Sequence, residues 1–265
     1  MAQAFIEFMS AGAAGELVRG GLGIVLGLLV GSFLATVLLR WPEGRSALRG
    51  RSACDGCGRQ LTPAELVPTV SWAVLNGRCR TCGTRIAPEH LIVELAAALI
   101  GAVALLAHSG LAGGIAALFG WWLLLVAALD AKHHWLPDRL TLPLIPAGLA
   151  VAVAGIGADW QERAVGAAVG FFVLAGVALG YRLLRRREGM GGGDPKLLAG
   201  IGAWLGWQQL PFVLLGAGLL GLAAVLLKRL RGGEVKATDR LALGALMALA
   251  AWPLWLLSVA VTQLT

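Results

Sequence analysis

The sequence of 265 residues has few charged side chains, and this scarcity excludes most soluble folds. Charged residues make up 14% of the chain and hydrophobic residues 58%, whereas a soluble domain carries roughly 25% charged residues. The apolar residues also fall in blocks close to the length of a bilayer span, about 20 residues. We therefore predict an all-α, polytopic membrane helix bundle whose main solvent is the lipid bilayer.

Basic residues are nearly missing from one set of the loops that this pattern predicts. Eight apolar segments are expected, at about 17–39, 90–108, 113–130, 139–157, 163–184, 195–207, 209–228 and 240–262, the sixth being short for a span. Of the 22 Lys and Arg residues, only Arg19 and Arg163 fall on the side of the N-terminus. The positive-inside bias then makes the opposite, basic side cytoplasmic. The same bias accounts for the net charge of +7, so no nucleic-acid partner is expected.

The start of the chain lacks the basic residues and short apolar core of a secretory signal. Its first apolar block follows the acidic residues Glu7 and Glu16 and runs to Leu39. We expect this block to be a retained span. The predicted organisation is a first transmembrane segment at 1–39, a cytoplasmic loop domain at 40–89 and a transmembrane bundle at 90–265.

Cysteine is absent outside the 40–89 loop, which holds all four: Cys54, Cys57, Cys79 and Cys82. They form two Cys-x-x-Cys pairs that are 21 residues apart, close to the spacing of a paired zinc site. Gly58 and Gly83 follow the pairs and allow a tight turn around each metal ligand. A loop of this size needs such a staple, because its apolar core is too small. Two disulfides or free thiols are the alternatives, and a reducing cytoplasm disfavours the disulfides.

Acidic residues near apolar spans are costly and become candidates for function. Asp130 ends the third segment, where the helix dipole disfavours a carboxylate. Asp194 precedes Pro195 at the start of the sixth segment, and Asp138 opens the fourth, so N-capping is a competing explanation for both. Glu94, one turn inside the second segment, is expected to bond between helices or to serve a cofactor or substrate.

A glycine-rich strip precedes Asp194, with Gly189, Gly191, Gly192, Gly193 and then Lys196 beyond the aspartate. Glycine lets another backbone approach closely, as an extended substrate peptide would. Two carboxylates that share a site hold one proton between them, so one can activate water while the other polarises a peptide carbonyl. From the helix ends we expect Asp194 to be the ionised member and Asp130 the protonated one. The sequence thus predicts an aspartyl protease with Asp130 and Asp194 as catalytic residues.

The Gly189–Lys196 segment, Asp130 and Leu136-Pro137-Asp138 resemble the type IV prepilin peptidases, bifunctional enzymes of the GxGD aspartyl protease group. The four cysteines and Gly77-Arg78-Cys79-Arg80 match the cytoplasmic loop of that family. The resemblance implies cleavage of prepilin or pseudopilin leaders after Gly on the cytoplasmic face of the bacterial inner membrane. It also implies methylation of the new N-terminus by S-adenosylmethionine, and the four cysteines as ligands of a structural Zn²⁺.

Several departures from the family pattern leave other functions open. Pro195 replaces an aromatic or aliphatic residue, Ala64-Glu65-Leu66 replaces Asp-Asn-Ile, and the 241–245 segment lacks a proline. No motif identifies the methyl-donor site, for which Glu94, Arg40 and the loop around Ser71 are the candidates. The alternatives are a GxGD protease without methyltransferase activity, a proton-coupled transporter that uses the two aspartates, and an anchored zinc module.

Overall fold

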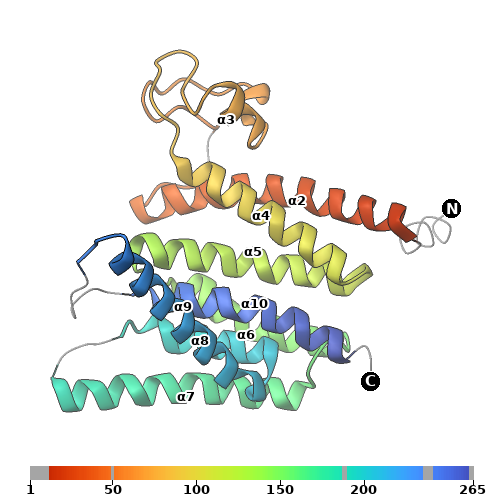
Figure 1. Ribbon diagram of the computed structural model, residues 1–265, viewed down its shortest axis with the longest axis vertical. Coiled ribbons are helices and arrows are strands. Elements are labelled where there is room, and N and C mark those ends of the chain that lie inside the picture. The colour runs from red at the N-terminus through yellow and green to blue at the C-terminus, as the bar shows by residue number, and fades with distance from the viewer. Residues whose placement is uncertain (1–11, 49–50, 187–189, 235–240, 263–265) are drawn as a thin grey trace. The chain divides into compact units, whose positions relative to one another are not determined.

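The computed structural model describes residues 12–48, 51–186, 190–234 and 241–262, which are almost entirely helical (Figure 1). Within these ranges the β-structure is limited to two isolated bridges, Ala53 with Gln60 and Arg78 with Arg85. The long helices are α2 (Gly12–Arg40), α4 (Pro88–Ala107), α5 (Gly110–His133), α6 (Asp138–Val153), α7 (Trp160–Arg185), α8 (Gly193–Leu205), α9 (Leu210–Leu230) and α10 (Leu243–Thr262). Short helices are η1 (Trp41–Glu43), η2 (Pro63–Leu66), α3 (Val70–Val74) and η3 (Trp207–Gln209).

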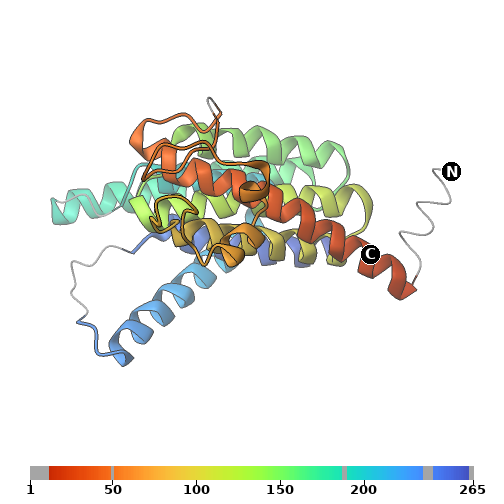
Figure 2. The ribbon, with the colours of Figure 1, turned by 90° about the horizontal axis from the view of Figure 1, so that it is seen from above.

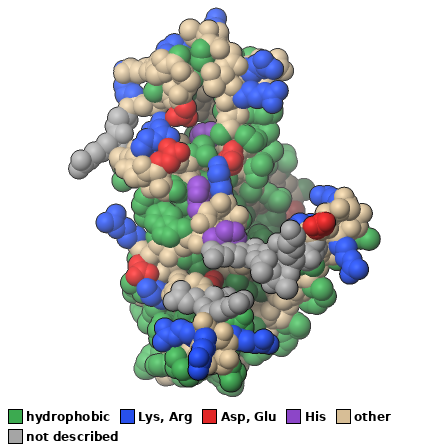
Figure 3. All heavy atoms as spheres, turned by 90° about the vertical axis from the view of Figure 1, so that its left-hand side faces the viewer, with side chains coloured by type: hydrophobic (Ala, Val, Ile, Leu, Met, Phe, Trp, Pro, Cys, Tyr) green, Lys and Arg blue, Asp and Glu red, His purple; other side chains and the backbone are tan. Residues whose placement is uncertain are grey.

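These eight long helices correspond to the eight predicted apolar segments, which confirms the all-α membrane class. Six helices in the described ranges are long and apolar enough to cross a bilayer. The other two, α6 with 16 residues and α8 with 13, are shorter than the roughly 20 residues that a span needs. Large areas of exposed apolar side chains are visible in Figure 3, as expected for surfaces that face lipid.

The chain forms two compact units, 1–125 and 126–265, and the boundary between them falls within α5. In unit 1, α2 crosses α4 at a glycine-lined contact (Figure 1). A Cβ atom at Gly23 would clash with the carbonyl group of Gly101, and one at Gly27 would clash with that of Ala97. Small residues of this kind let helix backbones approach closely in a membrane. The predicted division of the chain into a first transmembrane segment, a loop domain and a bundle, with boundaries after residues 39 and 89, stays a prediction.

Unit 2 is built around the short helix α8, which α6, α7 and α10 contact. Almost every residue of α8 is buried, so it forms the core of this unit despite its length. Glycines again set the spacing, since a Cβ at Gly166 of α7 would clash with the carbonyl oxygen of Gly202 in α8. The Trp204 indole donates to the Leu144 carbonyl at 3.0 Å and ties α8 to α6. Figure 2 shows the C-terminal end of α9 leaning away from the rest of this unit.

A fully buried arginine joins α7 to the end of α6. Arg163 donates hydrogen bonds to the carbonyl oxygens of Ala158 and Gly148, both at 2.7 Å, and to that of Ile156. A cation in an apolar bundle is expensive unless polar groups surround it. These carbonyl groups satisfy the guanidinium, so Arg163 fixes where α7 begins against α6.

The close contact between α7 and α8 predicts a strong effect of side-chain size at Gly166. We expect Gly166→Leu to lower the free energy of unfolding by about 1–3 kcal/mol or more, because backbone atoms on α8 would have to move. The matched control is Gly176→Leu in the same helix, where a Cβ would meet nothing within 4 Å. Thermal unfolding in detergent micelles measures both variants. Equal unfolding temperatures would contradict this packing.

Candidate active site and metal centre

The four cysteine side chains of the 40–89 loop converge on one point in unit 1. Their sulfur atoms all lie within 4.8 Å of one another. The Cys54 and Cys82 sulfurs are 3.7 Å apart, whereas a disulfide bond is about 2.05 Å long. Four thiolates around Zn²⁺ at about 2.3 Å place neighbouring sulfurs about 3.8 Å apart. The donor set therefore fits a tetrahedral metal ion, and all four thiols are free.

Both Cys-x-x-Cys pairs adopt the same tight turn. The amide of Cys54 donates to Arg59 O and that of Gly58 to Cys54 O, at 2.9 and 2.8 Å. The amides of Cys79 and Gly83 make the equivalent bonds in the second pair, at 2.8 and 3.0 Å. Gly58 and Gly83 have φ values of +70° and +71°, which confirms why glycine follows each pair. The Gly56 amide also points at the Cys54 sulfur, at 3.4 Å.

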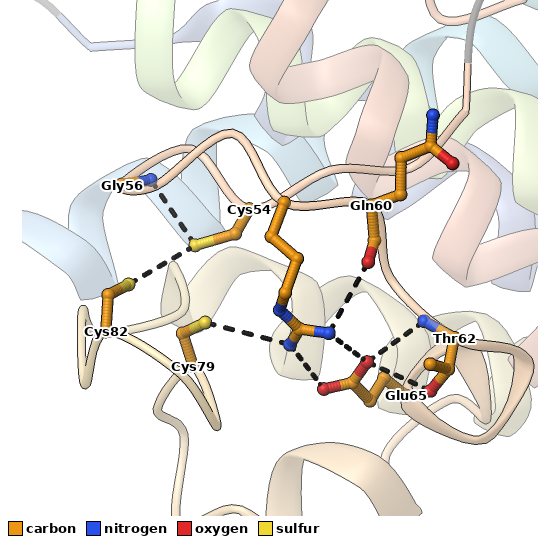
Figure 4. A network of polar contacts seen from close by, with 8 residues as sticks. Cys54, Gly56, Gln60, Thr62, Glu65, Cys79 and Cys82 are labelled. Atoms are coloured by element: carbon orange, nitrogen blue, oxygen red, sulfur yellow. Dashed lines mark hydrogen bonds and ion pairs between the residues drawn. The ribbon is translucent and has the colours of Figure 1, made fainter.

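An arginine connects the two turns (Figure 4). Arg59 pairs with both carboxylate oxygens of Glu65, at 2.6 and 3.0 Å, and reaches the Cys79 sulfur at 3.9 Å. This pairing lowers the pKa of Glu65 to about 2. Hydrogen bonds from the backbone amides of Cys82 and Thr81 lower the pKa of the Cys79 thiol to about 6. Cys79 thus favours the thiolate form that a metal binds, whereas the neighbouring thiols and burial raise the pKa of Cys57 to about 11.

Asp130 in unit 2 is buried, with 6% of its surface exposed. Although it lies in the last turn of α5, its Oδ2 accepts a hydrogen bond from the Ala245 amide at 2.8 Å. Ala245 is in the first turn of α10, where unpaired amides and the helix dipole favour negative charge. A Cβ at Gly244 would lie 2.9 Å from the same oxygen. The start of α10 therefore offers Asp130 a backbone donor from a segment far away in the sequence.

Asp194 is also buried, with 7% exposed, and lies near Asp130 in the same unit. It belongs to α8, which is outside the six candidate spans. Burial, and then the charge of Asp130, raise the pKa of Asp194 to about 6. This direction differs from the expectation that the helix N-terminus keeps Asp194 ionised. A helix end considered alone leaves out the burial of Asp194 and the nearby charge of Asp130, which act in the opposite direction.

Neither competing N-cap explanation agrees with the structure. The N-cap of α8 is Gly192, and Asp194 is already inside the helix without a capping bond. Asp138 is the first residue of α6, after the N-cap Pro137. Its two oxygens instead accept from Lys196 Nζ at 2.6 and 2.8 Å, an ion pair that ties α6 to α8. Lys196 is thus engaged with Asp138 at the start of α8.

The glycines before Asp194 differ in their surroundings. A Cβ at Gly192 would meet nothing within 4 Å, and one at Gly191 would meet only Asp194 Oδ2, at 3.5 Å. Gly193 is different, since its Cβ would lie 2.5 Å from the Cβ of Leu136. Gly191 and Gly192 therefore leave the approach to Asp194 open, whereas Gly193 permits close packing. Gly189 lies outside the described residues.

Sequence reasoning missed Gly244 and Ala245, which position Asp130. The signal was weak: a glycine followed by alanine near the start of the last apolar segment. Leu136 entered the sequence analysis only as part of the Leu136-Pro137-Asp138 motif. It lies beside two glycines from distant segments, Gly193 and Gly244. A Cβ at Gly244 would be 2.7 Å from Leu136 Cδ1. Such contacts between distant segments cannot be read from local sequence.

The two units match two family models. The model of the type IV leader peptidase family matches residues 117–226, and that of the bacterial peptidase A24 N-terminal domain matches residues 25–108. The chain is 34% identical to the prepilin leader peptidase/N-methyltransferase of Dichelobacter nodosus, over 94% of this chain and 96% of that protein. It is 38% identical to the protein of that name from Pseudomonas aeruginosa, over 86% and 87% of the two chains. No solved structure matches.

The described residues thus combine two buried aspartates in a helical unit with a four-cysteine loop earlier in the chain. With this coverage and identity, the chain belongs to the type IV leader peptidase family.

The sulfur geometry predicts one metal ion per chain in the purified protein. We expect Cys57→Ser and Cys82→Ser to lose that metal, because three thiolates bind it more weakly than four. Arg80→Ala is the matched control, since Arg80 is exposed and lies between the ligands Cys79 and Cys82. Elemental analysis and limited proteolysis of the loop, with and without a chelator, measure the effect. Metal-free protein whose loop resists both protease and chelator would contradict the site.

The raised pKa of Asp194 predicts a pH-dependent stability. An acid whose pKa rises from 3.8 to about 6 on folding stabilises the protein below pH 4, and this stabilisation is lost as pH rises through about 6. This difference in pKa corresponds to about 3 kcal/mol in the free energy of unfolding. Asp194→Asn should therefore match the wild type at pH 4 and unfold at a higher temperature at pH 8. The control Asp138→Asn, at an exposed and ion-paired aspartate, should show no rise in unfolding temperature at pH 8. A difference between Asp194→Asn and the wild type that is the same at pH 4 and pH 8 would refute the raised pKa of Asp194.

Proposed function

We propose that this protein cleaves the leader of type IV prepilins or pseudopilins after Gly and methylates the new N-terminus with S-adenosylmethionine. Membership of the leader peptidase family supports both activities, since its relatives carry both in their names. The observation that carries the peptidase is the burial of Asp130 and Asp194 in unit 2, near enough for the charge of Asp130 to raise the pKa of Asp194. The protein acts as a multi-pass protein of the bacterial inner membrane, with its active site on the cytoplasmic side.

The two aspartates divide the work of hydrolysis. Asp130, whose Oδ2 accepts a hydrogen bond from the Ala245 amide, acts as the base and takes a proton from water as the water oxygen attacks the scissile carbonyl carbon. Asp194, neutral below its raised pKa, donates a hydrogen bond to the carbonyl oxygen. Asp130 then passes its proton to the leaving amine as the C–N bond breaks. Water adds to the peptide and both carboxyl groups regain their starting states.

The glycine strip supports an extended substrate backbone beside Asp194. Gly191 and Gly192 have open surroundings, so a peptide can lie against their main chain. Lys196 supports this region indirectly through its ion pair with Asp138, which fixes the first turn of α8. Gly189 completes the strip in sequence. The apolar helix that follows a prepilin leader suits the lipid around the spans.

The cysteine centre holds Zn²⁺ in a structural role. Cys54, Cys57, Cys79 and Cys82 together fill a tetrahedral shell and leave no open position for substrate. Zn²⁺ suits four thiolates in a small loop that has no apolar core of its own.

S-adenosylmethionine supplies a methyl group to the new amine. The nitrogen lone pair forms the C–N bond while the C–S bond breaks, sulfur keeps the electron pair and the amine releases a proton.

A cleavage assay tests this proposal. The purified protein is incubated with a prepilin-like peptide in micelles with and without S-adenosylmethionine, and the products are identified by mass. We expect cleavage after Gly, with a further methyl mass only when the donor is present. Asp130→Asn and Asp194→Asn should each lower cleavage by about 10³-fold or more, because each removes one half of the proton-sharing pair.

Asp159→Asn is the matched control, because Asp159 is an exposed acid in the same unit, at the N-cap of α7. It should retain most of the cleavage activity. A variant lacking either Asp130 or Asp194 that cleaves at the wild-type rate would refute the mechanism. Proton-coupled transport without cleavage would favour the transporter alternative.

A further inference from the structure

Unit 1 contains a cavity of about 370 Å³ between the cysteine loop and the helix ends next to it. Its walls come from the end of α2, both cysteine turns, α3 and the start of α4. Small-molecule sites have volumes of about 300–1,000 Å³. Because Asp130 and Asp194 both belong to unit 2, the cavity is a candidate for a ligand other than the scissile peptide.

Glu94 gives this cavity a buried carboxylate with one free oxygen. The residue is 5% exposed and lies on α4. Its Oε2 accepts from the Thr69 amide at 2.6 Å and from the Thr69 hydroxyl at 3.2 Å. No donor among the described residues pairs with Oε1. A carboxylate buried in an apolar span is costly, so its second oxygen is a place for a ligand group.

The backbone next to Glu94 is strained. Thr69 has φ of +61°, a value that a β-branched residue rarely adopts. The two bonds to Glu94 hold it there and set the start of α3, which brings Ser71 and Trp72 to the cavity wall. Strain of this kind persists where the surroundings enforce it, often at ligand sites.

The remaining walls add an aromatic surface and positive charge. Trp72 is fixed against Gly77, where a Cβ would lie 2.8 Å from the indole ring. Its Nε1 is buried and has no partner among the described residues. Guanidinium groups come from four other wall residues, Arg40, Arg45, Arg59 and Arg85. Two of them are already paired, Arg45 with Glu43 and Asp55, and Arg59 with Glu65. The cavity therefore combines a flat ring, a free carboxylate oxygen and several cations.

We propose that this cavity binds S-adenosylmethionine, and the inference rests on the methyltransferase part of the proposed function. The donor is an adenosine joined to an amino acid, so it presents an aromatic base, ribose hydroxyls, cationic groups and a carboxylate. The indole of Trp72 suits the base, Glu94 Oε1 suits the hydroxyls or a cation, and the arginines suit the carboxylate. Glu94 and Trp72 are binding residues of this chain for the methyl donor.

Calorimetric titration of the full chain with S-adenosylmethionine, without peptide, tests the site. Glu94→Gln keeps an acceptor for Thr69 but turns the free oxygen into an amide donor, so we expect binding at least about tenfold weaker. Glu89→Gln on the same helix lies outside the cavity wall and should bind as the wild type does. Trp72→Leu should weaken binding similarly. Metal content and unfolding temperature confirm that each variant is folded.

A second matched pair separates the cavity from general surface charge. Arg85 lines the cavity and Arg80 does not, although both belong to the second cysteine turn. Weaker binding in Arg85→Ala alone supports the site, whereas equal losses in both variants overturn it. Wild-type protein that cleaves peptide but binds no donor overturns the inference and leaves the peptidase standing. Donor binding that is unchanged in folded Glu94→Gln and Trp72→Leu places the site elsewhere and also overturns it.

Discussion

The hydrogen bond from the Ala245 amide to Asp130 is the interaction on which the chemistry of unit 2 depends. A carboxylate at the C-terminal end of its own helix would favour a proton. The first turn of α10 supplies the opposite field and a direct donor to the Oδ2 atom of Asp130. Burial and the charge of nearby Asp130 raise the pKa of Asp194, although a hydrogen bond from the Gly191 backbone opposes the rise. In the proposed mechanism, this backbone amide distinguishes Asp130 as the base from Asp194 as the acid.

The hydrogen bond from Ala245 to Asp130 can serve the aspartate pair only because α8, which carries Asp194, is held rigidly in place. Backbone contacts at Gly166 and Gly202, and at Gly148 and Ala203, let α8 pack between α6 and α7 without intervening side chains. Helix α8 has too few residues to span a bilayer, so its position depends on these neighbours rather than on lipid. The Asp138–Lys196 ion pair fixes its first turn, which carries Asp194. Rigid placement of this kind is what a pair of catalytic groups requires.

Sequence alone predicted much of this architecture, because apolar runs and clustered cysteines are local signals. The eight segments and the metal site followed from block length and the Cys-x-x-Cys spacing, and both turns have the glycine conformation that the spacing implied. The sequence could not show that α6 and α8 are buried between longer helices, since burial by protein and burial by lipid select the same residues. Nor could it show that residues 244–245 reach Asp130, a contact across 115 positions.

The two activities of the proposed function fall in different parts of the chain. The metal turns and the cavity belong to unit 1, the aspartates to unit 2, and the two family models match these same regions separately. Cys54 and Cys79 are both metal ligands and cavity walls. A metal that closes the two turns therefore also shapes the cavity, although it touches no reacting atom. On this view the structural metal belongs to the methyl-transfer half of the enzyme, because unit 2 makes the aspartate pair from its own helices.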